Sequence, residues 1–570
     1  MTNHIIENTI MKKNILLLSL LIIIGTTSCE SFLKETNYSA VTSEGGYYET
    51  AKGLESIISS CYTPLRFWAG KEDAFGISET GTDLIAAGAG CVDNNMAAYL
   101  PGLDGTNSAL TFFYDRYYAA INYCNTAIYN VKNVPVSDDL KSKREGEARF
   151  LRAFYYWILV ENFGDIYYSD VPSTTIITSP QKTSVTEVYN KIFEDLDFAI
   201  SSKLSTSMSD GGRVTLWAAK AFKARLLLFR GSQTNSNEMH EQAYQLAKDV
   251  IDNGPFELAD DYKSIWLMEN SDGSDNKEVV WYVDYSNDHL YNQELDDHII
   301  RSGGNNAHLL FTMKYDDQPG LVRSIKYGRP FNRYMPTRYL LDLYDETIDQ
   351  RFEGSFQTLW EKNDSKTGDY TLMQDTAIWC IKTVATASQR EWAKNRYQIF
   401  DRNDVYDSQT GETTNVHRYI ALSKFEDPTR LSINEDRSSR DGFMIRISEL
   451  YLIAAEAGAI TGKNDALTYM NTLREKRAIP GNEAAMAVTL ADIKDLDFIL
   501  DERARELAGE QLRWFDLKRC GTEKFTDRIK KGNPNAANVK EYHVLRPVPQ
   551  TALDAVENKE EFKQNEGYNR

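Results

Sequence analysis

Apolar residues recur at helical intervals in two separate parts of the chain. In residues 142–163, Ala148, Leu151, Tyr155 and Leu159 follow one another at spacings of three and four, which places them on one face of a helix. The same periodicity predicts helices over residues 183–201, 213–230 and 237–253, and again over 448–462, 465–477 and 490–520. Successive helices of this length form pairs of roughly 35–40 residues, a period typical of tetratricopeptide-type repeats.

Local signals mark the ends of several of these helices. Gly164 and the pair Gly254-Pro255 stop the helices that precede them. Ser184, with Glu187 three residues later, has the sequence of a capping box. Further helices are predicted over residues 50–65, 104–130 and 338–345.

Residues 256–440 differ from the parts around them. They are rich in Asn, Asp, Gly, Tyr and Trp, and they contain only short strand-like runs such as residues 278–283. Helical repeats accept long insertions on one face, so one body can hold both kinds of segment. We therefore predict a mainly α fold: a tetratricopeptide-like superhelix of helix pairs, at about residues 142–255 and 446–520, with a large irregular loop region, at about 256–440, that contains short strands.

The amino terminus has the layout of an export signal. Met11, taken as the true start, is followed by Lys12 and Lys13, then by a short apolar run at residues 15–24 and by small residues. This run is too short to span the roughly 30 Å hydrocarbon core of a bilayer. We expect residues 1–28 to be a signal peptide.

The predicted cleavage site is followed by a cysteine, Cys29, which is a candidate site for lipid attachment. Small residues before a cysteine resemble the bacterial lipobox, whose cysteine is acylated, with palmitate among its fatty acids. Thr26 departs from that pattern, which usually has an aliphatic residue three positions before the cysteine. We expect a lipid anchor at Cys29, an extended lead over residues 29–45 and a single folded body over 46–570.

Charge and motif content favour a binding protein over an enzyme. The formal net charge of −19 argues against nucleic acid, whose binding needs clustered Lys and Arg. The sequence has no Gly-x-Ser-x-Gly motif, and His240-Glu241 lacks the second histidine of a zinc protease motif. We expect no catalytic residues, metal or cofactor. A glycoside hydrolase stays open as an alternative, because 83 acidic residues offer many carboxylate pairs. A disulfide between Cys61 and Cys91 also stays open.

Two loop regions combine aromatic rings with amides and carboxylates, the groups that stack on sugar rings and bond their hydroxyls. The predicted ligand-binding residues of the first region are Trp68, Asp83, Asn94, Asn95 and Tyr99. Those of the second region are Tyr291, Asn292 and Tyr334, beside Asn305-Asn306 and Phe331.

Charged residues within apolar helices are interpreted as structural ion pairs, because buried charges usually have partners. Arg503, Glu506, Glu510 and Arg513 stand at helical spacings, and Trp514 follows as a packing residue. Arg152 and Glu456 are interpreted in the same way.

Several motifs, taken in order, resemble those of the SusD/RagB family of nutrient-binding outer-membrane lipoproteins. They run from residue 147 to residue 568 and comprise the segments at 147–157 (EARFLRAFYYW), 162–165 (NFGD), 212–225 (GRVTLWAAKAFKAR), 336–344 (PTRYLLDLY), 349–352 (DQRF), 445–457 (IRISELYLIAAEA), 471–477 (NTLREKR), 502–519 (ERARELAGEQLRWFDLKR), 547–550 (PVPQ) and 564–568 (QNEGY).

The resemblance implies a helical fold with four tetratricopeptide-like pairs, with the irregular region at about 256–440 on the ligand side. It also implies a partner, a SusC-like TonB-dependent barrel. It implies a lipid-anchored protein of the outer membrane that faces the cell exterior, captures glycans and passes them to the barrel. A peptide-binding import lid of RagB type is the nearest alternative. An envelope glycoside hydrolase and a scaffold without a small ligand are the others.

Overall fold

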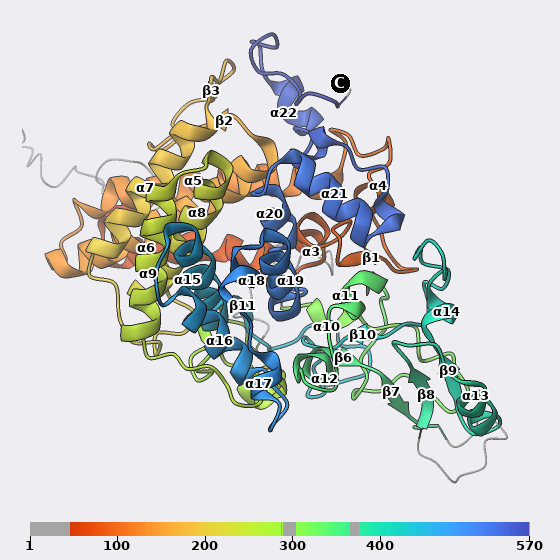
Figure 1. Cartoon of the computed structure of the whole chain (residues 1–570). Helices are drawn as coiled ribbons and strands as arrows, with labels where there is room; N and C mark the ends of the chain where they lie inside the picture. Colours follow the sequence, from red (N-terminus) through yellow and green to blue (C-terminus); the bar gives the residue numbers. More distant parts are fainter. Residues whose placement is uncertain (1–45, 287, 289–303, 365–375, 569–570) are drawn as a thin grey trace, which may run out of the picture.

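The computed structural model describes residues 46–286, 288, 304–364 and 376–568 (Figure 1). The predicted signal peptide, Cys29 and the lead over residues 29–45 lie outside the described residues, as do Tyr291 and Asn292.

The first helices form the base of a helical layer. They are η1 (Tyr47–Glu49), α2 (Ala51–Tyr62), η2 (Thr63–Phe67), α3 (Glu72–Ser78), α4 (Asn94–Ala98), α5 (Ser108–Val131) and α6 (Asp138–Phe163). α6 is capped by Ser137, whose side chain accepts from Leu140 N, and it ends at Gly164, whose φ is +73°. From Gly146 onward every residue of α6 except Arg149 is buried, because α5 and α7 pack against it.

The layer continues through α7 (Val185–Ser201), α8 (Leu216–Thr234), α9 (Asn237–Asn253), α15 (Ile447–Thr461) and α16 (Ala466–Lys476). The capping box of Ser184 and Glu187 is confirmed, and α9 has the predicted bounds. α15 packs against both α9 and α16. It therefore joins the two helical parts of the chain into one layer, which spans the left half of Figure 1.

The prediction of one continuous helix over residues 490–520 is wrong. It is divided into α18 (Leu490–Lys494), α19 (Leu496–Leu507) and α20 (Arg513–Lys518). Asp495 caps α19, and Gly509 and Gln511 adopt positive φ angles of +77° and +61°, which turn the chain before α20. The chain then continues through α21 (Thr522–Gly532), η5 (Pro534–Ala536), η6 (Glu541–Val544) and α22 (Gln550–Ala555).

The middle of the chain is irregular and contains short elements. Its helices are η3 (Tyr262–Trp266), η4 (Met268–Asn270), α10 (Ala307–Leu310), α11 (Arg338–Asp342), α12 (Arg351–Ser355), α13 (Ala387–Ala393) and α14 (Arg402–Val405), and α17 (Glu483–Met486) follows α16. The strands here are β4 (Val279–Val283), β5 (Tyr334–Pro336), β6 (Phe356–Gln357), β7 (Leu359–Glu361), β8 (Thr376–Cys380), β9 (Gln398–Phe400), β10 (Ala421–Leu422) and β11 (Gly442–Arg446).

Short antiparallel ladders occur within this region, between it and the strand Ile85–Ala87, and outside it. β4 pairs with β11, whose last residue leads directly into α15. β1 (Ile85–Ala87) pairs with β5, and β2 (Ile166–Tyr167) pairs with β3 (Lys182–Thr183). β7, β8 and β9 form a separate sheet that projects with α13 at the lower right of Figure 1.

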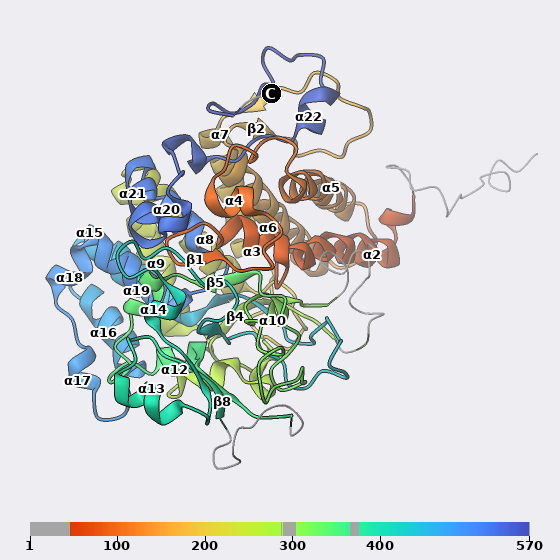
Figure 2. The ribbon, with the colours of Figure 1, turned by 90° about the vertical axis from the view of Figure 1, so that its right-hand side faces the viewer.

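Two large groups of buried apolar side chains fill the molecule. One lies among the helices and includes Phe154, Trp157 and Trp281. The other lies within the irregular region and includes Phe311, Trp360 and Tyr419. The predicted fold class, mainly α with an irregular region of short strands, is confirmed (Figures 1 and 2). In the described part of the chain, no helix combines the length and apolarity needed to cross a membrane.

Candidate ligand-binding face

The β1–β5 ladder brings the two predicted loop regions together. Ile85 pairs with Pro336 and Ala87 with Tyr334. Beyond the ladder, Gly88 N donates to Arg333 O and Gly90 N donates to Asn332 O, each at 2.8 Å. Residues 88–90 therefore lie directly against residues 331–333. We call the two segments that continue from this contact, residues 88–95 and residues 329–333, the loop face.

The two segments approach so closely that a glycine is required between them. A Cβ atom on Gly90 would lie 2.0 Å from the carbonyl oxygen of Phe331. The Arg333 guanidinium also donates to Gly90 O at 2.5 Å. Since any side chain at position 90 would push the segments apart, Gly90 fixes the shape of the loop face.

The loop face presents an aromatic ring beside two cations. The guanidinium carbons of Arg329 and Arg333 lie 5.0 and 4.9 Å from the ring centroid of Phe331, within cation–π range. Arg333 Nε also lies 2.9 Å from the buried carboxylate of Glu72, which limits the freedom of this arginine. All three side chains of this cluster are half-buried, so they remain partly open to a ligand.

Asn94 and Asn95 add amides to the same face. Both are exposed, and their side chains form no hydrogen bond within the described residues. The residue before them, Asp93, caps α4 by accepting from Met96 N at 2.9 Å, and it also accepts from Asn107 Nδ2 at 2.5 Å. Asp93 therefore holds the backbone of the two asparagines while their amides stay available for a ligand.

Buried hydrogen bonds hold residues 304–306, which precede the second segment of the loop face. Lys71 Nζ donates to Gly304 O at 2.5 Å and to Asn306 Oδ1 at 2.9 Å, and burial lowers the pKa of Lys71 to about 7. Asn305 Nδ2 donates to Arg440 O at 3.1 Å. Both asparagines are buried, so their side chains form internal hydrogen bonds and do not reach the surface.

Four of the predicted ligand-binding residues lie in the core instead of on the surface. Trp68 is 3% exposed and packs edge-to-face against Phe113 and Phe154. Asp83 is fully buried and pairs with Arg513 through both carboxylate oxygens, at 2.7 and 2.6 Å.

The other two buried residues are tyrosines. Tyr99 ends α4 in a left-handed conformation, with its ring 4.9 Å from that of His543. Tyr334 donates from its hydroxyl to Glu72 O at 2.8 Å, inside the second apolar group. Neighbouring elements therefore cover the rings of Trp68, Tyr99 and Tyr334, and Asp83 is used in an internal ion pair, so these four predicted ligand-binding residues do not face solvent.

The residues interpreted as structural charges are buried and paired. Glu506 on α19 lies between Arg446 of β11 and Arg477, which follows α16, at 3.0 Å from each. Both arginines also reach Glu278, at 2.8 and 2.7 Å. Glu510 binds Arg446 at 2.7 Å, but it lies in the turn after α19 and not on the helix face that its spacing suggested.

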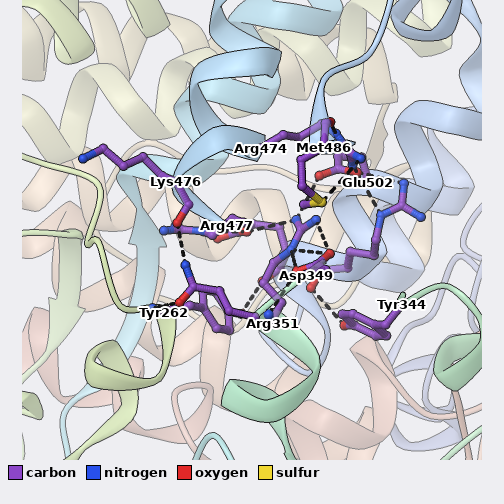
Figure 3. Close-up of polar contacts among 12 residues, drawn as sticks. Tyr262, Tyr344, Asp349, Arg351, Arg474, Lys476, Arg477, Met486 and Glu502 are labelled. Atoms are coloured by element: carbon purple, nitrogen blue, oxygen red, sulfur yellow. Dashed lines mark hydrogen bonds and ion pairs between the residues drawn. The ribbon is translucent and has the colours of Figure 1, made fainter. Parts of the chain in front are cut away.

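Figure 3 shows the part of this network around Arg351. Arg351 binds Asp349 at 2.8 Å and Glu502 at 2.9 Å, and Arg474 approaches Glu502 from α16. These arginines hold the pKa of Glu502 well below its usual range. The network connects α12, α16 and α19 by charge pairs that are closed to solvent, as a structural role requires.

The remaining predicted pairs are also internal. Arg152 binds Asp195 at 2.7 Å, and Arg519 binds Glu456 at 2.6 Å. Arg503 binds Asp516 at 2.7 Å, and Trp514 is fully buried beside Phe515 and Phe525.

Among the described residues, the cysteines form no disulfide and the candidate metal ligands form no cluster. All five described cysteines are free thiols, and Cys61 lies beside Cys124 and not beside Cys91. Within the described ranges, no three His, Cys, Asp or Glu side chains are grouped to hold a metal ion. The loop face offers guanidinium, amide and aromatic groups to a ligand.

One feature had no counterpart in the sequence predictions. A groove of about 750 Å³ lies between α5, α22 and the segment after β2. Three of its tyrosines, Tyr114, Tyr118 and Tyr156, belong to the regular pattern of α5 and α6, so periodicity alone marks them as core residues.

Known proteins share this architecture. The SusD family model matches residues 277–568, and a model described as "Starch-binding associating with outer membrane" matches residues 32–228. A SusD-like protein of Formosa agariphila is 25% identical over 560 residues, which cover 94% of this chain and 96% of that protein. The starch-binding protein SusD of Bacteroides thetaiotaomicron is 23% identical over 434 residues, which cover 75% and 73% of the two chains.

Solved structures agree in fold. A laminarin-binding SusD-like protein has a TM-score of 0.67 at 19% identity, covering 91% of this chain and 100% of its own. Surface glycan-binding protein A of Bacteroides thetaiotaomicron, in complex with laminarihexaose, has a TM-score of 0.66 at 19% identity, covering 90% and 99%. With one family model spanning more than half of its length, and with the motifs that first suggested the resemblance, the chain belongs to the SusD family.

Proposed function

We propose that this chain is a cell-surface lipoprotein that captures oligosaccharides and passes them to a SusC-like TonB-dependent transporter in the outer membrane. Membership of the SusD family carries the proposal. The names of several relatives support the ligand class, since they are described as starch-binding, laminarin-binding or surface glycan-binding proteins. Residues 1–28 would direct export, and acylated Cys29 would tether the body, residues 46–570, to the outer leaflet.

The loop face is the proposed capture site. Phe331 offers apolar contact to a sugar ring, and the free amides of Asn94 and Asn95 can donate to and accept from hydroxyl groups. Arg329 and Arg333 add directed donors that suit hydroxyl or carboxylate oxygens. The backbone around these groups is fixed by Gly90, Asp93 and the β1–β5 ladder, so little ordering is needed when a ligand binds.

Binding without turnover is the expected activity. Capture for transport needs ground-state affinity and release, and it does not need stabilisation of a transition state. The charged pairs described above are internal and do not flank a cleft in the way that glycoside hydrolysis requires.

Affinity electrophoresis through gels that contain starch, laminarin or other polysaccharides tests the site. We expect the double variant N94A/N95A to lower the affinity for the retarding polysaccharide about tenfold, because two directed hydrogen bonds are lost. Asn237→Ala removes an exposed amide at the start of α9, away from the loop face, and should leave retardation unchanged. Equal retardation of both variants would remove the loop face from the proposal.

A further inference from the structure

A cluster of aromatic side chains lies on the projecting sheet, away from the loop face. Trp392 of α13 and Trp379 of β8 flank Tyr397, whose ring centroid lies 5.7 Å from that of Trp392 and 6.3 Å from that of Trp379. Trp392 is 50% exposed and Trp379 is half-buried. We call these three residues the aromatic cluster. Figures 1 and 2 both place α13 and β8 in the lower part of the molecule, whereas β1 and α10 lie nearer its middle.

The β7–β8–β9 sheet fixes the position of Trp379. Its neighbours across the sheet are Leu359 of β7 and Ile399 of β9. The residues next to these on the strands, Trp360 and Ile378, are buried, since side chains alternate between the two faces of a strand. They belong to the same buried apolar group as the side chains of β5. The sheet therefore shares a core with the β1–β5 ladder that supports the loop face.

The ring of Trp392 is held in place although it is half-exposed. The guanidinium carbon of Arg396 lies 4.7 Å from the ring centroid, and Arg396 Nη1 donates to the backbone oxygen of Trp392 at 2.6 Å. Asn395 has a φ of +61°, and this left-handed residue turns the chain after α13 and brings Tyr397 against the Trp392 ring. An exposed indole that is fixed in this way loses little freedom when a ligand packs on it.

The polar atoms of the aromatic cluster form no hydrogen bond with a described residue. The indole N–H groups of Trp379 and Trp392 have no acceptor there, and the Tyr397 hydroxyl has no partner. Asn395 is exposed beside them, and its amide is also without a hydrogen bond in the described part of the chain. An apolar protein surface would cover these donors at a cost, whereas sugar hydroxyls both accept and donate hydrogen bonds. The chemistry of the cluster therefore favours a glycan as its ligand.

We propose that the aromatic cluster is a second carbohydrate-binding surface, in which a sugar ring packs on Trp392 and bonds the indole N–H groups, the Tyr397 hydroxyl and the Asn395 amide. The inference rests on the proposed function, because it adds a second contact for the same class of ligand. An indole offers a large apolar area with a polar tip, as the faces and hydroxyls of a sugar require. A polysaccharide that reaches both the cluster and the loop face is held at two points, which strengthens its binding beyond that of either site alone.

The test uses affinity electrophoresis of the full chain through gels that contain starch, laminarin, xylan or pectin. Trp392→Ala should lower the affinity for the retarding polysaccharide about tenfold, because one of two linked contacts is lost. Trp392→Phe keeps a ring and should recover most of the lost affinity. Tyr129→Ala is the matched control, since Tyr129 of α5 is 36% exposed and has the Lys132 ammonium 4.8 Å from its ring centroid. The control should be retarded like the wild type.

A second readout reports on the aromatic cluster alone. N-bromosuccinimide oxidises accessible indole rings, and mass spectrometry of peptides locates the oxidised residue. Trp392 should be oxidised in the free chain and protected by the retarding polysaccharide. Protection should persist in N94A/N95A at saturating polysaccharide, because the cluster binds sugar independently of the loop face.

The outcomes separate the two proposals. If none of the polysaccharides retards the wild-type chain, glycan capture fails and the second surface fails with it. If N94A/N95A binds more weakly while Trp392→Ala binds like the wild type and Trp392 stays unprotected, the loop face stands and the second surface is overturned. If Trp392→Ala binds like the wild type but loses a protein that co-purifies from the cell envelope, the cluster is a protein contact and the proposal is also overturned.

Discussion

Trp68 and Trp392 have the same side chain in opposite environments. Trp68 is 3% exposed and is enclosed by Phe113, Phe154 and Phe515. Trp392, on α13, is 50% exposed and has the Arg396 guanidinium 4.7 Å from its ring centroid. At the scale of single residues, burial and not residue type decides whether an aromatic ring stabilises the fold or is available to a ligand.

Replacement of the two tryptophans should separate these roles. Trp68→Ala leaves a cavity in a packed core and should lower the free energy of unfolding by about 3–5 kcal/mol. Trp392→Ala removes a half-exposed ring and should cost less than about 1 kcal/mol. Urea denaturation followed by circular dichroism measures both. Similar losses in the two variants would contradict the assignment of Trp68 to the core.

Asp83 illustrates why site residues are hard to predict from sequence. Its partner Arg513 is 430 positions away in the sequence, so no local sequence pattern predicts the ion pair. Residues 88–90 and the segment around Phe331 were parts of separate regions in the sequence, and the β1–β5 ladder places them together. Residue types identified the loops, but the exposure of each side chain depends on contacts made by distant elements.

At the scale of elements, the signals for helices are local in the sequence, whereas the pairing of strands depends on residues far apart in the sequence. α9 has the predicted bounds because its periodicity and its end signals are local. The break between α19 and α20 was missed, since Glu510 and Arg513 continue a helical charge spacing through a turn. The short strands pair over long sequence distances, so only the apolar run of β4 was visible in advance.

The buried network joins these elements through charges. β11 contributes Arg446, the end of α16 contributes Arg477, and both meet Glu506 of α19. A network of this kind stabilises the fold only while its carboxylates are ionised. Burial alone would raise the pKa of Glu506, but the three surrounding arginines lower it well below the usual value near 4.5.

Acid should therefore destabilise the protein. The pKa values of Glu502, Glu506 and Asp516 are all lowered in the fold, so the unfolded chain binds more protons as the pH falls through about 4.5. The stability that these three carboxylates contribute to the folded protein is complete above that pH and is lost progressively below it.

We expect the urea midpoint of unfolding to fall between pH 6 and pH 3, and to fall less steeply in Glu506→Gln. Glu194→Gln, in an exposed pair, should follow the wild type. An equally steep fall in Glu506→Gln would contradict this role for the network.

At the scale of the whole molecule, the proposed function separates two regions. The loop face would meet the glycan, and the acylated amino terminus would remain in the membrane.

The tether is testable at its first residue. Mass spectrometry of the mature protein should find an acylated Cys29 at the amino terminus, and Cys29→Ala should move the protein from the membrane fraction to the soluble fraction. Polysaccharide binding by the released variant should equal that of the wild type, because Cys29 precedes the residues that the structure describes. An unmodified Cys29 in the mature protein, or cleavage elsewhere, would refute the anchor and leave the binding proposal intact.

Isothermal titration calorimetry tests the central claim most directly. The purified protein would be titrated with a panel of oligosaccharides, including those from starch and laminarin, and with a panel of peptides of similar size. We predict saturable binding of at least one oligosaccharide, no binding of the peptides at the loop face, and weaker oligosaccharide binding by N94A/N95A. Saturable binding of peptides alone, or release of hydrolysis products from a bound glycan, would contradict the account.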